Sequence, residues 1–89
     1  MSEINHITGR QLAAGRALAG LSQAELVAKA NISLPTLRRM EACEGPASGM
    51  PNNVEAVRRA LEMVGIEFIE ENGGGPGVRL RKARKGRLK

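Results

Sequence analysis

Seven cationic side chains near the C-terminus form the clearest candidate binding group in this chain of 89 residues. No acidic residue lies among them, whereas residues 1–78 carry seven basic and nine acidic side chains, a net charge of −2. A cationic segment on a mildly acidic body implies a polyanionic partner, either nucleic acid or an anionic membrane surface. The seven are Arg79, Arg81, Lys82, Arg84, Lys85, Arg87 and Lys89.

Other residues that support chemistry are scarce. The one histidine, His6, has no Cys, His or acidic cluster at metal-ligand spacing, and it lacks the partners of a catalytic triad. The one cysteine, Cys43, excludes an internal disulfide and fits a reducing compartment. The glycine run at 73–77 lacks the Lys-Ser/Thr of a phosphate-binding loop and indicates a turn. We therefore expect no enzyme, metal, cofactor or small-molecule ligand.

The length and hydropathy of the chain predict one small domain with a C-terminal tail. No apolar run approaches the length that spans a membrane. The N-terminus has neither a basic leader nor the apolar core of a signal peptide. We expect a cytoplasmic protein with no membrane partner.

Two short helices joined by a tight turn are predicted between Leu21 and Glu41. Ser22 is suited to cap the first helix, with Glu25 in the reciprocal capping position. Asn31 tolerates the left-handed conformation that the turn requires, and the second helix begins at Ser33. Residues expected to face the core are Leu26, Ala30, Ile32, Leu37 and Met40, and those expected to face outward are Pro35, Thr36, Arg38 and Arg39.

At these residues the chain resembles the Cro/C1-type (XRE) helix-turn-helix family of phage-repressor-like DNA-binding domains. The resemblance covers roughly residues 8–64, with Asn31 at the usual turn glycine and Cys43 at a second glycine position. It implies a mainly α, lambda-repressor-like bundle of about four helices and a structural ion pair between Arg16 and Glu41. The matching residues are Gln23, Glu25, Leu26, Ala30, Ser33, Leu37 and Glu41.

The resemblance further implies that the second helix of this pair enters the major groove of double-stranded DNA. Arg39, or Arg38, would bond guanine O6 and N7, and Thr36 would bond a phosphate or a base edge. The alternative is that these side chains are ordinary solvated helix residues. The implied DNA-binding residues are Gln23, Ser33, Leu34, Pro35, Thr36, Arg38 and Arg39, and the expected backbone contacts of the tail are Arg79, Arg81, Lys82, Arg84 and Lys85.

Two further helices are predicted around this pair. One runs from about Thr8, its cap, to Ala19, with Gln11 as the reciprocal capping residue and Leu12 and Leu18 as its buried stripe. Gly15 on this helix permits close packing, and Gly20 ends it. The other helix starts near Asn52, which is expected to form a capping pair with Glu55, and stops at Gly65. Its apolar positions are Val54, Val57, Leu61 and Val64.

The segments IEFIEE and VRLR alternate in polarity around the turn-rich NGGGPG and predict a β-hairpin. Because an isolated hairpin is marginal in water, it should pack on the helices or pair with a second subunit. Phe68 then either completes the monomer core or contributes to a dimer interface. The predicted organisation is a helix-turn-helix domain over 1–65, a hairpin and candidate dimerisation element over 66–81, and a basic flexible tail over 82–89.

The resulting hypothesis is a sequence-specific regulator of transcription that binds operator DNA as a homodimer and controls its own gene. Two alternatives from other classes remain at this stage. One is an antitoxin-like or anti-activator module that binds a partner protein through the helices or the hairpin. The other is a general nucleic-acid binder whose affinity comes from the basic tail.

Overall fold

Local capping signals set the helix boundaries in the computed structural model, which describes residues 7–47, 51–70 and 72–81. Within these residues the chain forms four helices and one antiparallel hairpin, so the mainly α prediction is confirmed at this level. The elements are α1 (Gly9–Ala19), α2 (Gln23–Ala30), α3 (Leu34–Glu41), α4 (Pro51–Met63), β1 (Ile66–Ile69) and β2 (Gly77–Leu80).

Reciprocal capping boxes begin α1 and α2, as the sequence predicts. The Thr8 hydroxyl accepts a bond from the backbone N–H of Gln11, and the Gln11 side chain accepts one from Thr8. Ser22 and Glu25 repeat this arrangement at α2. Each box satisfies two backbone donors that a helix start would otherwise leave without partners.

The turn between α2 and α3 also follows the prediction. Asn31 has a φ of 59°, in the left-handed region, and its N–H bonds the carbonyl of Val27. Ser33 is the N-cap of α3, and Pro35 lies in the first helical turn, where a missing N–H leaves no bond unmade. The left-handed residue reverses the chain and the cap restarts the helix, which fixes the angle between α2 and α3.

Helix α4 begins close to the predicted position, but the predicted capping pair of Asn52 and Glu55 is wrong. The helix begins at Pro51, so Asn52 lies inside its first turn and cannot be its N-cap. Proline is favoured at the first helical position because its φ is already helical and it needs no N–H partner there. The helix then buries Val57 and Leu61 completely, and Gly65 follows it with a φ of 101°.

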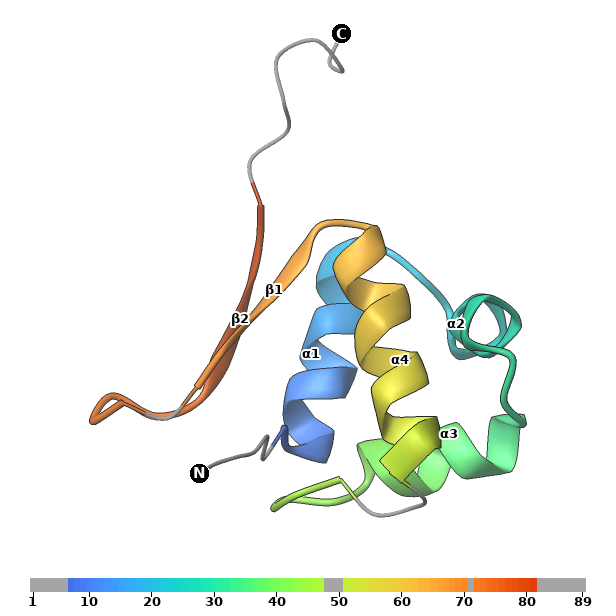
Figure 1. The fold of residues 1–89 in the computed structure, drawn as a ribbon, viewed down its shortest axis with the longest axis horizontal. Coiled ribbons are helices and arrows are strands. Elements are labelled where there is room, and N and C mark those ends of the chain that lie inside the picture. Colours follow the sequence, from blue (N-terminus) through green and yellow to red (C-terminus); the bar gives the residue numbers. More distant parts are fainter. Residues whose placement is uncertain (1–6, 48–50, 71, 82–89) are drawn as a thin grey trace, which may run out of the picture.

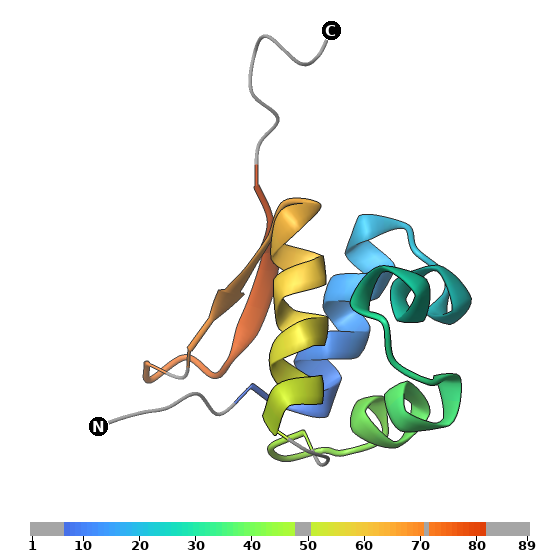
Figure 2. The same ribbon diagram turned by 45° about the vertical axis from the view of Figure 1, so that its right-hand side comes forward.

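The elements form three layers, which Figures 1 and 2 show from two directions. Helices α1 and α4 form the middle layer, α2 and α3 lie on one side of it, and the hairpin lies on the other. The core runs through these layers and contains buried residues from every described helix and from β1. Strand β2 contributes Val78, which is partly buried and packs against the edge of the core. Its buried apolar members are Leu12, Leu26, Ala30, Leu37, Met40, Val57, Ala60, Leu61 and Ile66.

Leu18 was expected in this core, and that prediction is wrong. Its side chain is 46% exposed. Gly15 takes the buried position opposite the hairpin, where an added Cβ would lie 3.2 Å from Ile66 Cγ2. Leu18 lies almost one turn further along α1, one residue before the end of the helix.

The hairpin packs on the helices through one face of its two strands. Register pairs Ile66 with Leu80 and Phe68 with Val78, so these four side chains share a face. Ile66 is fully buried, and Phe68 and Val78 pack against the core. Of the two predicted packing modes, the monomer therefore shows contact with its own helices.

Gln11 fastens the hairpin to α1 with a second pair of bonds. Its Nε2 donates to the carbonyl of Ile69 at 3.1 Å and to that of Gly77 at 2.9 Å, the two residues where the strands meet the loop. The same side chain accepts the Thr8 N–H in the capping box, so one amide uses its oxygen and both its hydrogens. The hairpin is thereby held at both its apolar face and its loop end.

We expect Gln11→Ala to lower the free energy of unfolding by about 2–3 kcal/mol, because it removes a cap bond and leaves two strand carbonyls without this donor. Urea unfolding followed by circular dichroism would measure the loss. Glu25→Ala is the matched control, since Glu25 fills the same capping position in α2 and its side chain is exposed. Equal losses in the two variants would show that the hairpin bonds contribute no stability.

Candidate nucleic-acid interface

The distribution of neutralised and free cations singles out α2 and α3. Among the described residues, six arginines have a carboxylate oxygen within 4.0 Å. The remaining three cations, Lys29, Arg38 and Arg39, have no carboxylate partner in that part of the chain, and all three lie on α2 or α3. The paired arginines are Arg10, Arg16, Arg58, Arg59, Arg79 and Arg81.

The ion pairs on α4 are close enough to shift the pKa values of its charged side chains. Arg58 Nη2 lies 2.7 Å from Glu55 Oε2, and its Nη1 lies 2.9 Å from Glu62 Oε2. The Arg58 bond lowers the pKa of Glu55, and the Glu55 bond raises the pKa of Arg58 against the opposing effect of burial. The positive charge on this helix is therefore satisfied locally, unlike that on α3.

Helix α3 divides into an apolar face and a polar face, as predicted. Leu37 and Met40 are fully buried against the core. Pro35, Arg38 and Arg39 are exposed, whereas Thr36, which was also expected to face outward, is partly buried. The helix thus presents two guanidinium groups to solvent from a backbone that is anchored by its other face.

Two of the predicted site residues bond each other at the start of α3. Ser33 Oγ accepts the N–H of Thr36 at 3.3 Å, which is its capping bond, and donates to Thr36 Oγ1 at 2.8 Å. Because the Thr36 oxygen accepts this bond, its own hydrogen stays available for an outside acceptor. Leu34, beside them, is partly buried. The geometry gives Ser33 a capping role and leaves Thr36 as a donor.

Gln23 has a structural bond that sequence analysis missed. Its Nε2 donates to Glu41 Oε1 at 2.9 Å, which links the start of α2 to the end of α3. This bond gives Gln23 a structural role, because it holds the start of α2 against the end of α3. The residues are eighteen positions apart, so no local pattern in the sequence indicates the contact.

The predicted ion pair between Arg16 and Glu41 is confirmed. Arg16 Nε lies 2.7 Å from Glu41 Oε2, and Nη2 lies 3.0 Å from Oε1, a bidentate pairing. Arg16 Nη1 also donates to the carbonyl of Leu21 at 3.1 Å. The bond to Glu41 raises the pKa of Arg16, against the lowering effect of burial. Together with Gln23, this network fixes the end of α3 against α1 and the start of α2.

The structure does not bring Arg79 and Arg81 to α3. Both lie on or directly after β2, where Arg79 bonds Glu67 at 2.9 Å and Arg81 donates to the carbonyl of Glu62. Figures 1 and 2 place the hairpin on the side of the middle layer opposite α2 and α3. The predicted tail residues Lys82, Arg84 and Lys85, like His6, lie outside the described residues.

Lys29 is a cation that sequence reasoning did not select. It lies in the last turn of α2, one residue before Ala30 and the turn that leads into α3. The signal that identifies it is the absence of a partner in the described part of the chain, while other cations there are paired. That signal requires a structure, because ion pairs between helices are not visible in the sequence.

Other kinds of site find no support in residues 7–47, 51–70 and 72–81. No group of three or more His, Cys, Asp or Glu side chains in that part of the chain could hold a metal ion. Cys43 Sγ lies 3.4 Å from the carbonyl of Arg39, as a weak donor. None of the helices there is both long enough and apolar enough to span a membrane.

Comparison with known proteins returns no family model and no curated protein that matches this chain. The geometry of α2 and α3 and the charges that they present are therefore the features that point to a function.

Proposed function

We propose that the chain is a sequence-specific DNA-binding regulator of transcription, in which α2 and α3 form the helix-turn-helix of a lambda-repressor-like bundle. The observation that carries this proposal is the set of free cations Lys29, Arg38 and Arg39. In a domain whose other described cations are paired, the unneutralised charge is concentrated where a DNA phosphate or base edge would supply the missing partner.

The shape of α3 supports major-groove reading. A helix fits this groove, and its base edges carry a distinguishable pattern of donors and acceptors. An exposed arginine can bond guanine O6 and N7 together, and the Thr36 hydroxyl can donate to an acceptor on a base or phosphate. The Arg16–Glu41–Gln23 network supplies the rigid support that such reading needs.

We further propose that the protein binds operator DNA as a homodimer and that its operators include one beside its own gene. One module makes few base contacts, whereas two modules related by a two-fold axis read half-sites about one helical turn apart. Footprinting on the DNA upstream of its own gene tests this directly. Protection of two related half-sites is the expected result, and uniform protection at all concentrations would favour a general nucleic-acid binder.

Arg39→Ala should weaken operator binding by about 1–3 kcal/mol and relax the preference at one base position, because a bidentate arginine contact discriminates against the wrong base. Fluorescence anisotropy on operator and random duplexes would measure both effects. Arg59→Ala is the matched control, since Arg59 is an exposed arginine on α4 that pairs with Glu55. Equal losses on operator and random DNA would make Arg39 a backbone contact and contradict its proposed role.

Removing residues 82–89 should lower affinity for operator and random DNA together while the preference between them stays. This segment carries five cations, and each one that neutralises a phosphate contributes about 0.9 to the salt dependence of binding. Titrations at several salt concentrations would therefore show a shallower slope for the shortened chain. If sequence preference disappears with the tail, α3 is not the reading element.

A further inference from the structure

Helix α3 presents an apolar group beside its two arginines. Pro35 lies in the first turn of the helix and is exposed, as are Arg38 and Arg39. Residues three and four positions apart lie on the same face of a helix, so Pro35 shares its face with both arginines. Neither arginine has a carboxylate partner in the described part of the chain. One exposed face therefore combines a carbon surface with two guanidinium groups.

The side chain of Pro35 can make apolar contacts only. Its ring carries carbon and hydrogen alone, and the residue has no backbone N–H to donate. The ring also has no rotamer freedom to lose when a partner covers it. Pro35 is thus a rigid apolar group that a binding partner can bury at little entropic cost.

Leu34, the neighbouring apolar residue, is less suited to such a contact. It is partly buried, and Leu37, which lies three residues further along the same face, is fully buried against the core. The Leu34 side chain therefore lies at the border between the core and solvent. Pro35 lies on the exposed face with the arginines.

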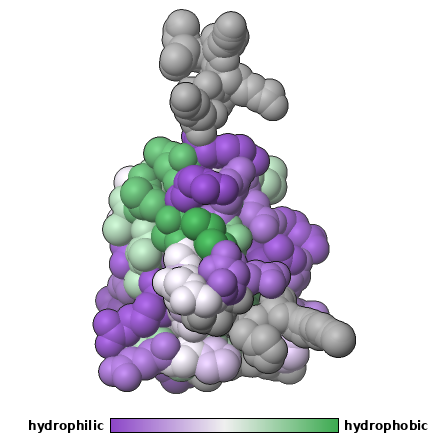
Figure 3. All heavy atoms as spheres, turned by 90° about the vertical axis from the view of Figure 1, so that its left-hand side faces the viewer, coloured by the Kyte–Doolittle hydropathy of each residue, from purple (hydrophilic) through white to green (hydrophobic). Residues whose placement is uncertain are grey.

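The large hydrophobic side chains that are exposed belong to other elements. Among the described residues they are Leu18, Met63 and Leu80, from α1, α4 and β2. Figure 3 shows hydrophobic residues on the face that carries the hairpin, and Figures 1 and 2 place the hairpin opposite α2 and α3. A ligand bound along α3 therefore meets Pro35 and not the hydrophobic residues of the hairpin.

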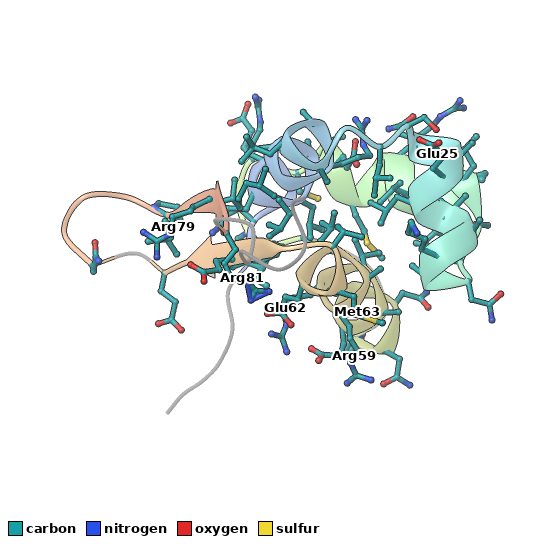
Figure 4. All side chains as sticks on the ribbon, turned by 90° about the horizontal axis from the view of Figure 1, so that it is seen from above. Glu25, Arg59, Glu62, Met63, Arg79 and Arg81 are labelled. Carbon is teal, nitrogen blue, oxygen red and sulfur yellow. The ribbon has the colours of Figure 1, made fainter. Side chains whose placement is uncertain are left out.

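Arginines outside α3 are also far from Pro35. Figure 4 shows Arg59 on α4 and Arg79 and Arg81 at the hairpin, apart from Glu25 on α2. Each of these three arginines has a carboxylate oxygen within 4.0 Å. The guanidinium groups that accompany the proline ring are therefore those of α3 itself.

Thymine is the base that fits an exposed apolar group in the major groove. It alone of the four bases presents a methyl group there, and apolar side chains contact this methyl. Side chains four apart on a helix are separated by about 5–6 Å, and successive bases of one strand by about 3.4 Å. When Arg39 bonds a guanine, Pro35 therefore meets the groove about one or two base pairs away.

We propose that Pro35 determines specificity by contacting the methyl group of a thymine that lies within about two base pairs of the guanine bound by Arg39. The inference rests on the proposed function and deepens it, because it names the bases that α3 reads together. Arg39 recognises one base by hydrogen bonds, and Pro35 recognises the other by burial of its methyl group.

The test uses the full-length chain and a half-site selected from random duplexes for tight binding. Each thymine of the half-site is replaced in turn with deoxyuridine, which removes the methyl group and keeps every hydrogen-bonding atom. At one thymine near a guanine this change should weaken wild-type binding about fourfold, the effect of exposing one buried methyl-sized group. In Pro35→Asn, which replaces the ring with a polar amide, the same change should have no effect.

Two controls make the methyl contact specific. Leu34→Ala shortens the neighbouring apolar side chain and should retain the fourfold response to deoxyuridine. A 5-methylcytosine–guanine pair in place of the thymine–adenine pair should bind wild type more tightly than a cytosine–guanine pair, because only the methyl group is restored. Helical circular dichroism verifies that each variant is folded.

A selected half-site without thymine, or wild-type binding that is unchanged by deoxyuridine at every thymine, would overturn the inference. A methyl effect that persists in Pro35→Asn, or that disappears in folded Leu34→Ala, would also overturn it. These outcomes leave the proposed function standing, because a preferred sequence has been found. A chain that selects no preferred sequence would instead overturn the proposed function, and the inference with it.

Discussion

Glu41→Ala is expected to lower the free energy of unfolding by about 3 kcal/mol, because it leaves the partly buried Arg16 without its carboxylate. The Glu41 side chain is only 7% exposed and accepts two bonds from Arg16 and one from Gln23. Truncation removes both acceptor oxygens and therefore all three bonds at once. Urea unfolding with circular dichroism as the signal would measure the change.

Two comparison variants make this result specific. Glu44→Ala removes a carboxylate that pairs with Arg10, but both side chains are largely exposed, so the expected loss is under about 1 kcal/mol. Replacing Arg16 and Glu41 together with Met and Leu should cost less than losing Glu41 alone, since no unpaired charge remains. A Glu41→Ala chain that unfolds like wild type would show that the network is not structural.

The same variant also tests how α3 is held. The network joins the end of α3 to α1 and α2, so its loss frees α3 to move against the core. Specific DNA binding needs base-contacting groups held within a fraction of an ångström, whereas backbone contacts tolerate more movement. In the folded fraction of Glu41→Ala we therefore expect operator affinity to fall further than affinity for random DNA.

Local signals account for what the sequence predicted well. The capping boxes at Thr8 and Ser22 and the left-handed turn at Asn31 depend on bonds between residues at most four apart. Neighbouring residues alone determine this geometry, so these features can be predicted without knowledge of the tertiary structure. The outward position of Arg38 and Arg39 follows in the same way from the helical period of Leu37 and Met40.

Contacts between distant residues explain what the sequence did not predict. Gln11 was identified as a capping residue, but its bonds to Ile69 and Gly77 span 58 and 66 positions. Gln23 was expected to contact DNA, and nothing in the sequence places it against Glu41. The exposure of Leu18 depends on the packing of the other elements around α1, which helix periodicity does not contain. Only the Arg16–Glu41 pair was anticipated over such a distance, and it came from the family resemblance.

The second large effect expected is at Gly9, where alanine should lower the free energy of unfolding by about 3 kcal/mol or more. A Cβ at this position would collide with the carbonyl oxygen of Met40 and lie 2.6 Å from that of Cys43. Both atoms are backbone, so a side-chain rotation cannot relieve the overlap and α1 must move away from the end of α3. This outweighs the gain of roughly 1 kcal/mol that alanine normally brings to a helix.

Gly45→Ala provides the comparison for Gly9→Ala. Gly45 accepts the N–H of Gly9 at 3.1 Å, so it belongs to the same contact, but a Cβ there meets no atom within 4 Å and its φ is not positive. Alanine at Gly45 should leave stability unchanged or raise it by up to about 1 kcal/mol, since it restricts the unfolded chain. Denaturant unfolding of both variants would therefore separate the steric effect of the added Cβ from its effect on the entropy of the unfolded chain. Similar stabilities would show that α1 and α3 are not in close contact at Gly9, and the close anchoring of α3 against α1 would have to be abandoned.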